Sequence, residues 1–220
     1  MEILNNLQKN ILEIFPGVKN SEKFYLTGGT ALVVFFLKHR LSEDLDFFTA
    51  EENLVPFFAE NLAKTLKKRD ISVEIKRKFN TFAEILVYNK KESALLHIAQ
   101  DSPFRFENPQ KTEYGIYVDS FIDIITNKLL CIFGRYEVRD YIDLYEALKT
   151  KKMDLVKVIR KAKEKDPGLE EYFLALSFQK IEKFPDDIKD IPVKMLKPVD
   201  FKKVKNFFLE NAVKLLDKGK

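Results

Sequence analysis

Tryptophan is absent from this 220-residue sequence, and cysteine and histidine are scarce, with one cysteine and two histidines. The single Cys131 excludes an intramolecular disulfide and a cysteine-based zinc cluster, and its apolar neighbours make it an expected small core residue. His39 and His97 are too few to build a histidine-rich metal centre. Any bound metal ion is therefore expected to have oxygen ligands, which Mg²⁺ prefers.

Long apolar runs are also missing. The longest, such as residues 31–37 and 129–133, are far shorter than the roughly 18 residues that a membrane-spanning helix needs. The N-terminus lacks the basic region and apolar core of a signal peptide. These absences predict a chain without membrane spans, located in the cytoplasm.

The residues present are typical of a globular protein, with 45% hydrophobic and 33% charged residues, 20 Phe and 8 Tyr. Lys and Arg number 38 against 34 Asp and Glu, so the formal charge is 38 − 34 = +4. Two lysine-rich segments, residues 149–152 and 161–165, are interleaved with acids. We interpret them as solvated helix faces in preference to a nucleic-acid patch.

Hydrophobic periodicity predicts two regions of different architecture. The first has strands at 24–26 and 45–48 and three antiparallel strands within 71–100, with helices at 3–15, 31–39 and 51–69. The second is helical, at 119–134, 138–149, 153–165, 168–182 and 200–217. Polar or proline-rich breaks lie at 106–115 and 185–198, and the latter is expected to be a linker. We predict an α/β core over residues 1–118 and a helical region over residues 119–220.

The strongest local feature is a Gly28-Gly29-Thr30 turn followed by Asp44-Leu45-Asp46. Carboxylates separated by one residue on a strand share a face, where their repulsion is relieved by a divalent cation. A Gly-Gly turn before a helix presents backbone N–H groups that favour a phosphate, and Thr30 adds a hydroxyl. Either feature alone is common as a structural turn or a strand edge, but together they predict a metal and triphosphate site for an in-line displacement.

The stretches 26–32 (Leu-Thr-Gly-Gly-Thr-Ala-Leu) and 39–48 (His-Arg-Leu-Ser-Glu-Asp-Leu-Asp-Phe-Phe) resemble the signature of AbiEii-type nucleotidyltransferases. These are the toxins of type IV toxin-antitoxin systems, within the DNA polymerase β-like superfamily. Looser similarity continues at residues 101–105, 128–129 and 139–144. The resemblance implies an α+β fold, in which a mixed sheet with flanking helices precedes a helical C-terminal half.

The resemblance also implies roles for the residues of the first motif. Asp44 and Asp46 would bind one or two Mg²⁺ ions, and the nucleotide phosphates would be held by Gly28, Gly29 and Thr30. Arg40 and Ser42 match the family's Arg-x-Ser-x-Asp pattern and would contact phosphate or brace the carboxylates. The alternative for these two is a turn with a surface Arg–Asp pair.

Lys128 lies in a predicted helix that is apolar on most of its circumference, so it must reach solvent or meet an anion. The resemblance makes it a ligand of the nucleotide phosphates. Asp140 and Asp143 would face the site from the next helix, where the family carries an acid important for activity. Asp140 is alternatively an early-helix acid favoured by the helix dipole, and Arg139 with Asp143 an exposed i,i+4 pair.

One departure concerns the third carboxylate that many polymerase β-like enzymes carry on a later strand. Here His97 occupies the expected position, where a neutral imidazole can accept the proton of an attacking hydroxyl. A strand histidine with a hydrogen-bond partner is the alternative. Glu84 and Asp140 are further candidates, and the sequence does not choose among them.

The leading hypothesis is an Mg²⁺-dependent nucleotidyltransferase that moves a nucleoside monophosphate from an NTP to an acceptor hydroxyl. The resemblance implies the 3′ end of tRNA as an acceptor and a cognate antitoxin as a partner. The competing hypothesis is an inactive nucleotide-binding or partner-binding module on the same fold, motivated by the missing third carboxylate.

Overall fold

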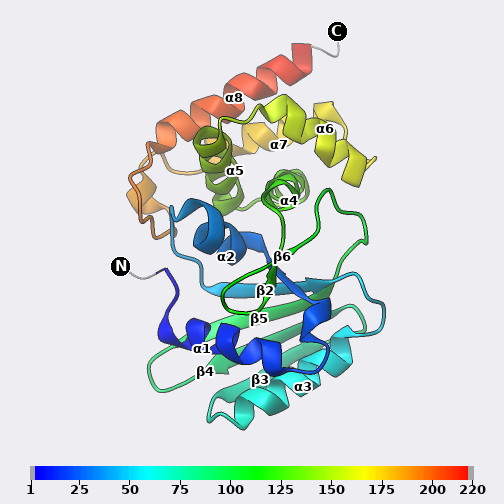
Figure 1. Cartoon of the computed structure of the whole chain (residues 1–220). Coiled ribbons are helices and arrows are strands. Elements are labelled where there is room, and N and C mark those ends of the chain that lie inside the picture. Colours follow the sequence, from blue (N-terminus) through cyan, green and yellow to red (C-terminus); the bar gives the residue numbers. More distant parts are fainter. Residues whose placement is uncertain (1–2, 218–220) are drawn as a thin grey trace. The chain divides into compact units, whose positions relative to one another are not determined.

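A computed structural model describes residues 3–217 of the chain (Figure 1). Residues 1–2 and 218–220, which the two predicted regions include, lie outside the described residues. The chain divides into two compact units, the first of Met1–Phe36 with Leu41–Ser120, the second of Leu37–Arg40 with Phe121–Lys220. Each unit is described by itself.

The first unit is built on a seven-stranded mixed sheet of order β3-β4-β5-β2-β1-β7-β6. Its strands are β1 (Tyr25–Thr27), β2 (Asp44–Thr49), β3 (Ser72–Lys78), β4 (Phe82–Tyr88), β5 (Ser93–Gln100), β6 (Gln110–Lys111) and β7 (Tyr117–Val118). The β3, β4 and β5 strands are antiparallel, as predicted, whereas β2 pairs with β5, and β1 with β7, in parallel. This mixed sheet with helices confirms the predicted α+β class.

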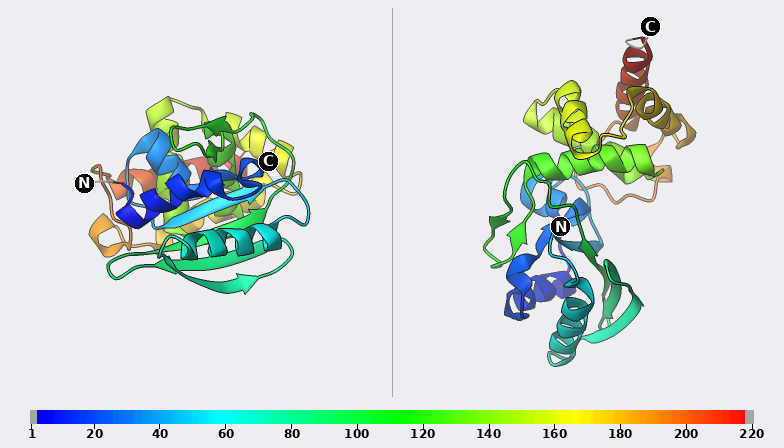
Figure 2. Two further views of the ribbon diagram at one scale, coloured as in Figure 1. Left: turned by 60° about the horizontal axis from the view of Figure 1, so that its bottom comes forward. Right: turned by 90° about the vertical axis from the view of Figure 1, so that its right-hand side faces the viewer.

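Helices α1 (Asn6–Ile14) and α3 (Val55–Lys67) cover the same face of this sheet (Figure 2). The fully buried Phe47 of β2 points into this layer, where its ring stacks on that of Phe15 with centroids 3.8 Å apart. Phe58 of α3 stacks on Phe24 at 3.9 Å. Aromatic burial of this kind supplies much of the core energy of a domain. Because side chains alternate along a strand, the neighbours of Phe47 in β2 point to the opposite face.

The segment after β1 differs from the helix predicted at 31–39. Helix α2 (Gly28–Leu32) begins immediately after the strand and continues as a π-helical segment, η3 (Val33–Leu37). The helix begins early because Gly28 has φ of 68°, a conformation that glycine adopts without strain and that reverses the chain at once.

The short strands β6 and β7 were missed because the sequence around them is polar and each has only two residues. The two are antiparallel, and the turn between them contains Gly115 with φ of 77°. Backbone pairing to β1, which lies far away in sequence, stabilises β7 in a way that local propensity does not report.

The second unit is a helical bundle, as predicted, formed by α4 (Phe121–Gly134), α5 (Val138–Lys151), α6 (Leu155–Lys165), α7 (Glu171–Gln179) and α8 (Phe201–Asp217). In its core the Phe208 ring meets the rings of Tyr141 and Phe178 edge to face, and each of the two centroid distances is 5.0 Å. The Tyr141 hydroxyl donates to the Ser177 carbonyl over 2.6 Å, which satisfies a buried polar group. Cys131 is only half-buried on α4, so its prediction as a core residue was wrong.

Residues 185–198 were expected to be a linker, and most of them are exposed, but some form specific contacts. The 3₁₀ turn η5 (Ile188–Asp190) is followed by the buried Ile191, and Met195 forms a β-bridge with Arg40. The His39 carbonyl accepts hydrogen bonds from the backbone N–H groups of residues 196 and 197. These backbone bonds explain why residues 37–40 belong to the helical unit, and proline content did not predict them.

Between residues 3 and 217 the structure contains no helix that is both long and apolar enough to span a bilayer.

Candidate active site

The β2 strand carries the two acids predicted to bind metal. Asp44 and Asp46 are half-buried, whereas the alternating Leu45 and Phe47 are fully buried against the helical layer. The carboxylates therefore lie on the face of the sheet opposite α1 and α3, as the one-residue spacing predicted.

The Gly-Gly turn packs directly against one of these acids. Thr27, the last residue of β1, is the register partner of Asp46, so the chain reverses at Gly28 beside the Asp46 side chain. A Cβ built on Gly28 would clash with Asp46 Oδ2 and lie 3.1 Å from its Cγ. Positive φ and this close approach both require glycine, and they place the Gly28-Gly29 backbone against the carboxylate.

Replacing Gly28 with alanine is expected to lower the free energy of unfolding by about 1–3 kcal/mol, because an L-residue is strained at this φ, and to displace the Asp46 carboxylate. Thermal unfolding and nucleotide transfer would measure the two effects. Gly17→Ala is the matched control, since no atom lies within 4 Å of a Cβ there. Equal behaviour of the two variants would contradict the proposed contact.

Thr30 and Asp44 tie α2 to β2. Thr30 is fully buried, and its hydroxyl donates to the Asp44 carbonyl. This bond fixes the start of β2 relative to the helix that follows the glycines. The hydroxyl thus has a structural partner within the protein.

His97 of β5 lies between two carboxylates. It is the register partner of Asp46 on one side and of Glu84 on the other. Its Nδ1 lies 2.8 Å from Asp46 Oδ1 and its Nε2 lies 3.6 Å from Glu84 Oε2. The hydrogen bond to Asp46 raises the pKa of His97, against the opposing effect of burial. The structure thus brings together Asp46, His97 and Glu84, three candidates of the sequence analysis.

The donor set at this face suits a hard cation. Two aspartates separated by one residue provide carboxylate oxygens on one surface, the ligands Mg²⁺ accepts together with phosphate oxygens and water. Over residues 3–217 the structure has no group of three or more His, Cys, Asp or Glu side chains arranged to hold a metal ion. The carboxylates of Asp44 and Asp46 have the chemistry that suits a magnesium ion.

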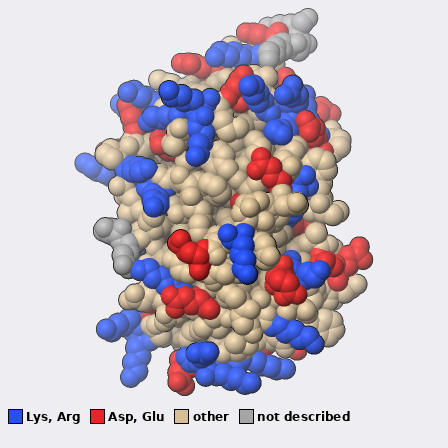
Figure 3. Space-filling view, in the orientation of Figure 1, with Lys and Arg blue, Asp and Glu red and all other residues tan. Residues whose placement is uncertain are grey.

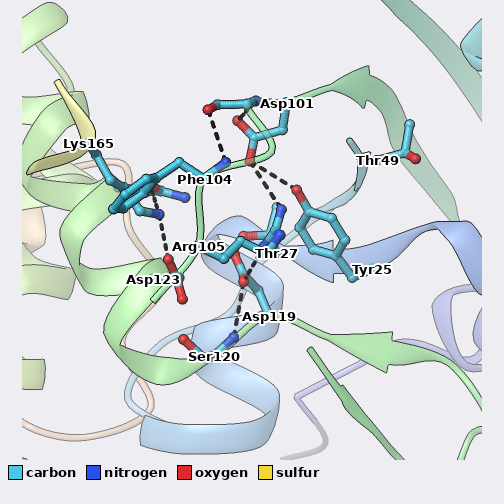
Figure 4. A network of polar contacts seen from close by, with 12 residues as sticks. Tyr25, Thr27, Thr49, Asp101, Phe104, Arg105, Asp119, Ser120, Asp123 and Lys165 are labelled. Atoms are coloured by element: carbon cyan, nitrogen blue, oxygen red, sulfur yellow. Dashed lines mark hydrogen bonds and ion pairs between the residues drawn. The ribbon is translucent and has the colours of Figure 1, made fainter. Parts of the chain in front are cut away.

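A second polar network supports the end of β1 (Figure 4). Asp119 accepts hydrogen bonds from the Thr27 hydroxyl at 2.9 Å and from Arg105 Nη1 at 2.7 Å. The Arg105 guanidinium lies 3.6 Å from the centroid of the Tyr25 ring, and Tyr25 donates to Asp101 at 2.9 Å. Thr27 directly precedes the glycine turn, so this network positions it. The looser motif at 101–105 contains Arg105, but no motif in the sequence indicated Asp119 as its partner.

In the helical unit, Lys128 is buried and meets two anions. Its Nζ lies 2.8 Å from Asp140 Oδ1 and 2.8 Å from Asp143 Oδ2. Burial opposes its charge, but the two carboxylates outweigh burial and raise the pKa of Lys128. Arg135 also binds Asp140, at 2.8 Å. Lys128 is therefore a charged residue inside an ion network.

Two residues that precede β2, Arg40 and Ser42, belong to different units. Arg40 belongs to the helical unit, where its Nε and Nη2 donate to both oxygens of Asp143 at 2.7 and 2.8 Å. His39 Nε2 lies 2.8 Å from the same carboxylate, while its Nδ1 is buried without a partner among residues 3–217. Ser42 belongs to the first unit, and its carbonyl accepts from the Gln8 side chain at 3.0 Å. The alternative considered for Arg40 was a surface Arg–Asp pair in a turn, whereas its pair with Asp143 is buried and joins residues 103 positions apart.

Comparison with known proteins matches the site to a family. Residues 10–111, just under half of the chain, match the family described as nucleotidyl transferase AbiEii toxin, type IV TA system. A curated relative, the uncharacterized protein aq_aa25 of Aquifex aeolicus (strain VF5), is 28% identical over 174 residues, which are 75% of this chain and 77% of that protein.

Two solved structures share the fold. A Helicobacter pylori protein assigned as a nucleotidyltransferase aligns with a TM-score of 0.58 and 21% identity, over 98% of this chain and 97% of that one. JHP933 from Helicobacter pylori aligns with a TM-score of 0.55 and 21% identity, over 96% of this chain and 90% of that one.

The chain is similar to nucleotidyltransferases over residues 10–111, and the solved structures show that it shares their fold. Its similarity is to the AbiEii toxins, which confirms the resemblance inferred from the glycine turn and the Asp-x-Asp strand.

Proposed function

We propose that the protein transfers a nucleoside monophosphate from an NTP to the 3′ end of tRNA in an Mg²⁺-dependent reaction. We propose further that it acts in the cytoplasm as the toxin of a type IV toxin-antitoxin system, with a cognate antitoxin. The observation that carries the chemistry is the Asp46 carboxylate packed against Gly28, with Asp44 on the same face. The family match supports the toxin role.

In this reaction the acceptor hydroxyl oxygen bonds to the α-phosphorus of the NTP as the bond to the bridging oxygen breaks, and pyrophosphate leaves. Such a displacement depends on positioning and on electrostatic stabilisation. The Gly28 backbone lies beside Asp46, which supports the role of the Gly28-Gly29 turn as the phosphate contact. We also propose that phosphate binding involves Lys128, Arg40 and Ser42. Asp140 is proposed to be needed for activity.

Asp44 and Asp46 would hold the Mg²⁺, one or two ions, and the metal when bound would neutralise charge on the phosphates. The hydrogen bond from His97 restricts the orientation of the Asp46 carboxylate, so we assign His97 first to positioning. We propose that His97 accepts the proton of the attacking acceptor hydroxyl, with Glu84 as the alternative.

The second candidate function is an inactive nucleotide-binding module. One observation favours it: His97 stands beside Asp46 where a third carboxylate is expected, and residues 3–217 contain no group of three metal-binding side chains. An inactive module would bind NTP without transferring label.

The test is label transfer from each of four α-³²P NTPs to total tRNA with Mg²⁺. Transfer from at least one NTP to tRNA, abolished by EDTA, is the expected result. Nucleotide binding detected by thermal shift, with no label on tRNA, total RNA or protein, would favour the inactive module. Label on protein alone would keep the enzyme class and overturn the tRNA acceptor.

The role of His97 can be separated by two substitutions. His97→Ala is expected to lower kcat by about 10- to 100-fold, as is usual when a ligand loses its supporting hydrogen bond. His97→Asn keeps an N–H donor near the position of Nδ1 and is expected to restore most of the activity. If the asparagine variant is as slow as the alanine variant, positioning alone is insufficient and the imidazole acts as proton acceptor.

A further inference from the structure

The charge of the chain is distributed unevenly between the two units. The helical unit contains 24 Lys and Arg against 17 Asp and Glu, a formal charge of 24 − 17 = +7. The first unit contains 14 against 17, which is 14 − 17 = −3. The total of +4 therefore conceals a basic helical unit, and a basic unit attracts polyanions.

Most of this excess lies in one stretch of sequence. Residues 149–165, the end of α5 and all of α6, contain eight Lys or Arg and two acids, a charge of 8 − 2 = +6. Figure 3 shows Lys and Arg gathered over the region of α6. The sequence alone favoured solvated helix faces here, because the lysines are interleaved with Glu and Asp.

The structure separates the cations of α6 into two groups. Lys163 and Lys165 are bound, to Glu171 and to Asp123, each at 2.7 Å (Figure 4 shows the second pair). Lys157 and Arg160 are exposed, and neither forms an ion pair with any residue in the range 3–217. They lie three positions apart, on one face of the helix.

Exposed aromatic rings follow this basic helix. The Lys163–Glu171 pair joins the end of α6 to the start of α7, where Tyr172 and Phe173 come next. Tyr172 is 57% exposed and Phe173 is 52% exposed, and their ring centroids lie 5.4 Å apart in an edge-to-face arrangement. The Lys163–Glu171 pair thus connects the helix of Lys157 and Arg160 to the exposed rings, and cations with exposed rings suit a single-stranded polynucleotide, whose bases stack while its phosphates meet Lys and Arg.

We propose that Lys157, Arg160, Tyr172 and Phe173 form a docking surface for the acceptor RNA. The cations contact backbone phosphates, and the rings stack on unpaired bases. This proposal rests on the proposed function, because an RNA acceptor gives the surface its occupant. An acidic protein is the competing occupant, but it would use the cations and leave the aromatic rings without a stacking partner.

The experiment uses the full chain and two double variants, with fluorescent tRNA and a 12-nucleotide single-stranded RNA as probes. Lys157→Gln with Arg160→Gln is expected to weaken RNA binding and to reduce the slope of log K against log salt by about 1.4, the value for two phosphate contacts on a single strand. Tyr172→Ala with Phe173→Ala is expected to weaken single-strand binding about fivefold or more and to leave the salt slope unchanged.

The control is Lys90→Gln with Lys91→Gln, the same change of charge at two exposed lysines of the first unit. Poly-glutamate serves as the acidic-protein probe, and thermal shift verifies folding. RNA binding and salt slope equal to wild type in the α6 variant, or an equal loss in the control, would overturn the proposal. The proposal would also be overturned if poly-glutamate bound as tightly as RNA and if its binding were unchanged by the Tyr172→Ala and Phe173→Ala substitutions. If RNA binding changes as expected but no NTP yields label, the surface stands and the proposed function fails.

Discussion

Asp46→Asn is expected to lower nucleotide transfer by about 10³-fold or more while leaving the fold intact, since removal of one preorganised electrostatic group already costs 10²–10³-fold. The amide is nearly isosteric, but it removes the charge that a magnesium ion needs. Asp46 is half-buried, and it pairs with His97, whose side chain is 22% exposed, so the fold loses little. Single-turnover label transfer at saturating NTP and Mg²⁺ is the measurement.

The matched substitution is Asp101→Asn, a carboxylate on the same unit that binds Tyr25 and Arg105 instead of facing the glycine turn. It is expected to retain transfer within about tenfold, because it acts only through the support of β1. If Asp46→Asn and Asp101→Asn lose equal activity, Asp46 contributes to structure and not specifically to metal binding. Asp44→Asn is expected to match Asp46→Asn.

Strand β2, which carries the two acids, was predictable because its sequence pattern is local. Alternation of Asp44 and Asp46 with Leu45 and Phe47 determines both the strand and the face that each side chain occupies. The glycine turn was equally local, since positive φ and the approach of Asp46 explain the residue type at Gly28. His97 was placed correctly on its strand, but its two carboxylate neighbours follow from parallel and antiparallel register, which one strand does not specify.

The ion network of the helical unit lay beyond local prediction. Arg40 and Asp143 are 103 positions apart in sequence, yet they form a buried bidentate pair. From the sequence, the partner considered for Asp143 was Arg139, one helical turn away, because i,i+4 spacing is the pairing that a helix pattern can indicate. Residues 37–40 join the helical unit through backbone bonds to residues 195–197, and no composition or periodicity reports such pairing.

Removing Asp143 is expected to have the largest effect on stability. Asp143→Asn leaves Arg40 and Lys128 buried beside a neutral group, and loss of one partner of a buried ion network costs about 3–5 kcal/mol. Urea unfolding at pH 7 measures the loss. Glu171→Gln is the control, because its pair with Lys163 is partly exposed and worth at most about 1 kcal/mol.

The same residue predicts a dependence of stability on pH. Burial alone would raise the pKa of Asp143, but Lys128 and Arg40 outweigh burial and hold it well below its usual range. The unfolded chain therefore binds the proton first as the pH falls through about 3.9. Stability from Asp143 is complete above that pH and is lost below it, so the difference between wild type and Asp143→Asn should shrink in acid. A difference that stays constant from pH 7 to pH 3 would contradict the assigned ion pairing.

Lys128→Met separates structure from catalysis in this network. With the lysine replaced, Asp143 keeps Arg40 and Asp140 keeps Arg135, so neither carboxylate is left without a cation. Because no buried charge is left unpaired, we expect a smaller loss of stability than for Asp143→Asn. Loss of transfer in a stably folded Lys128→Met variant would support contact with the nucleotide phosphates. Retention of transfer would restrict Lys128 to the interior of the helical unit, because a phosphate contact of this enzyme class cannot be removed without loss of rate.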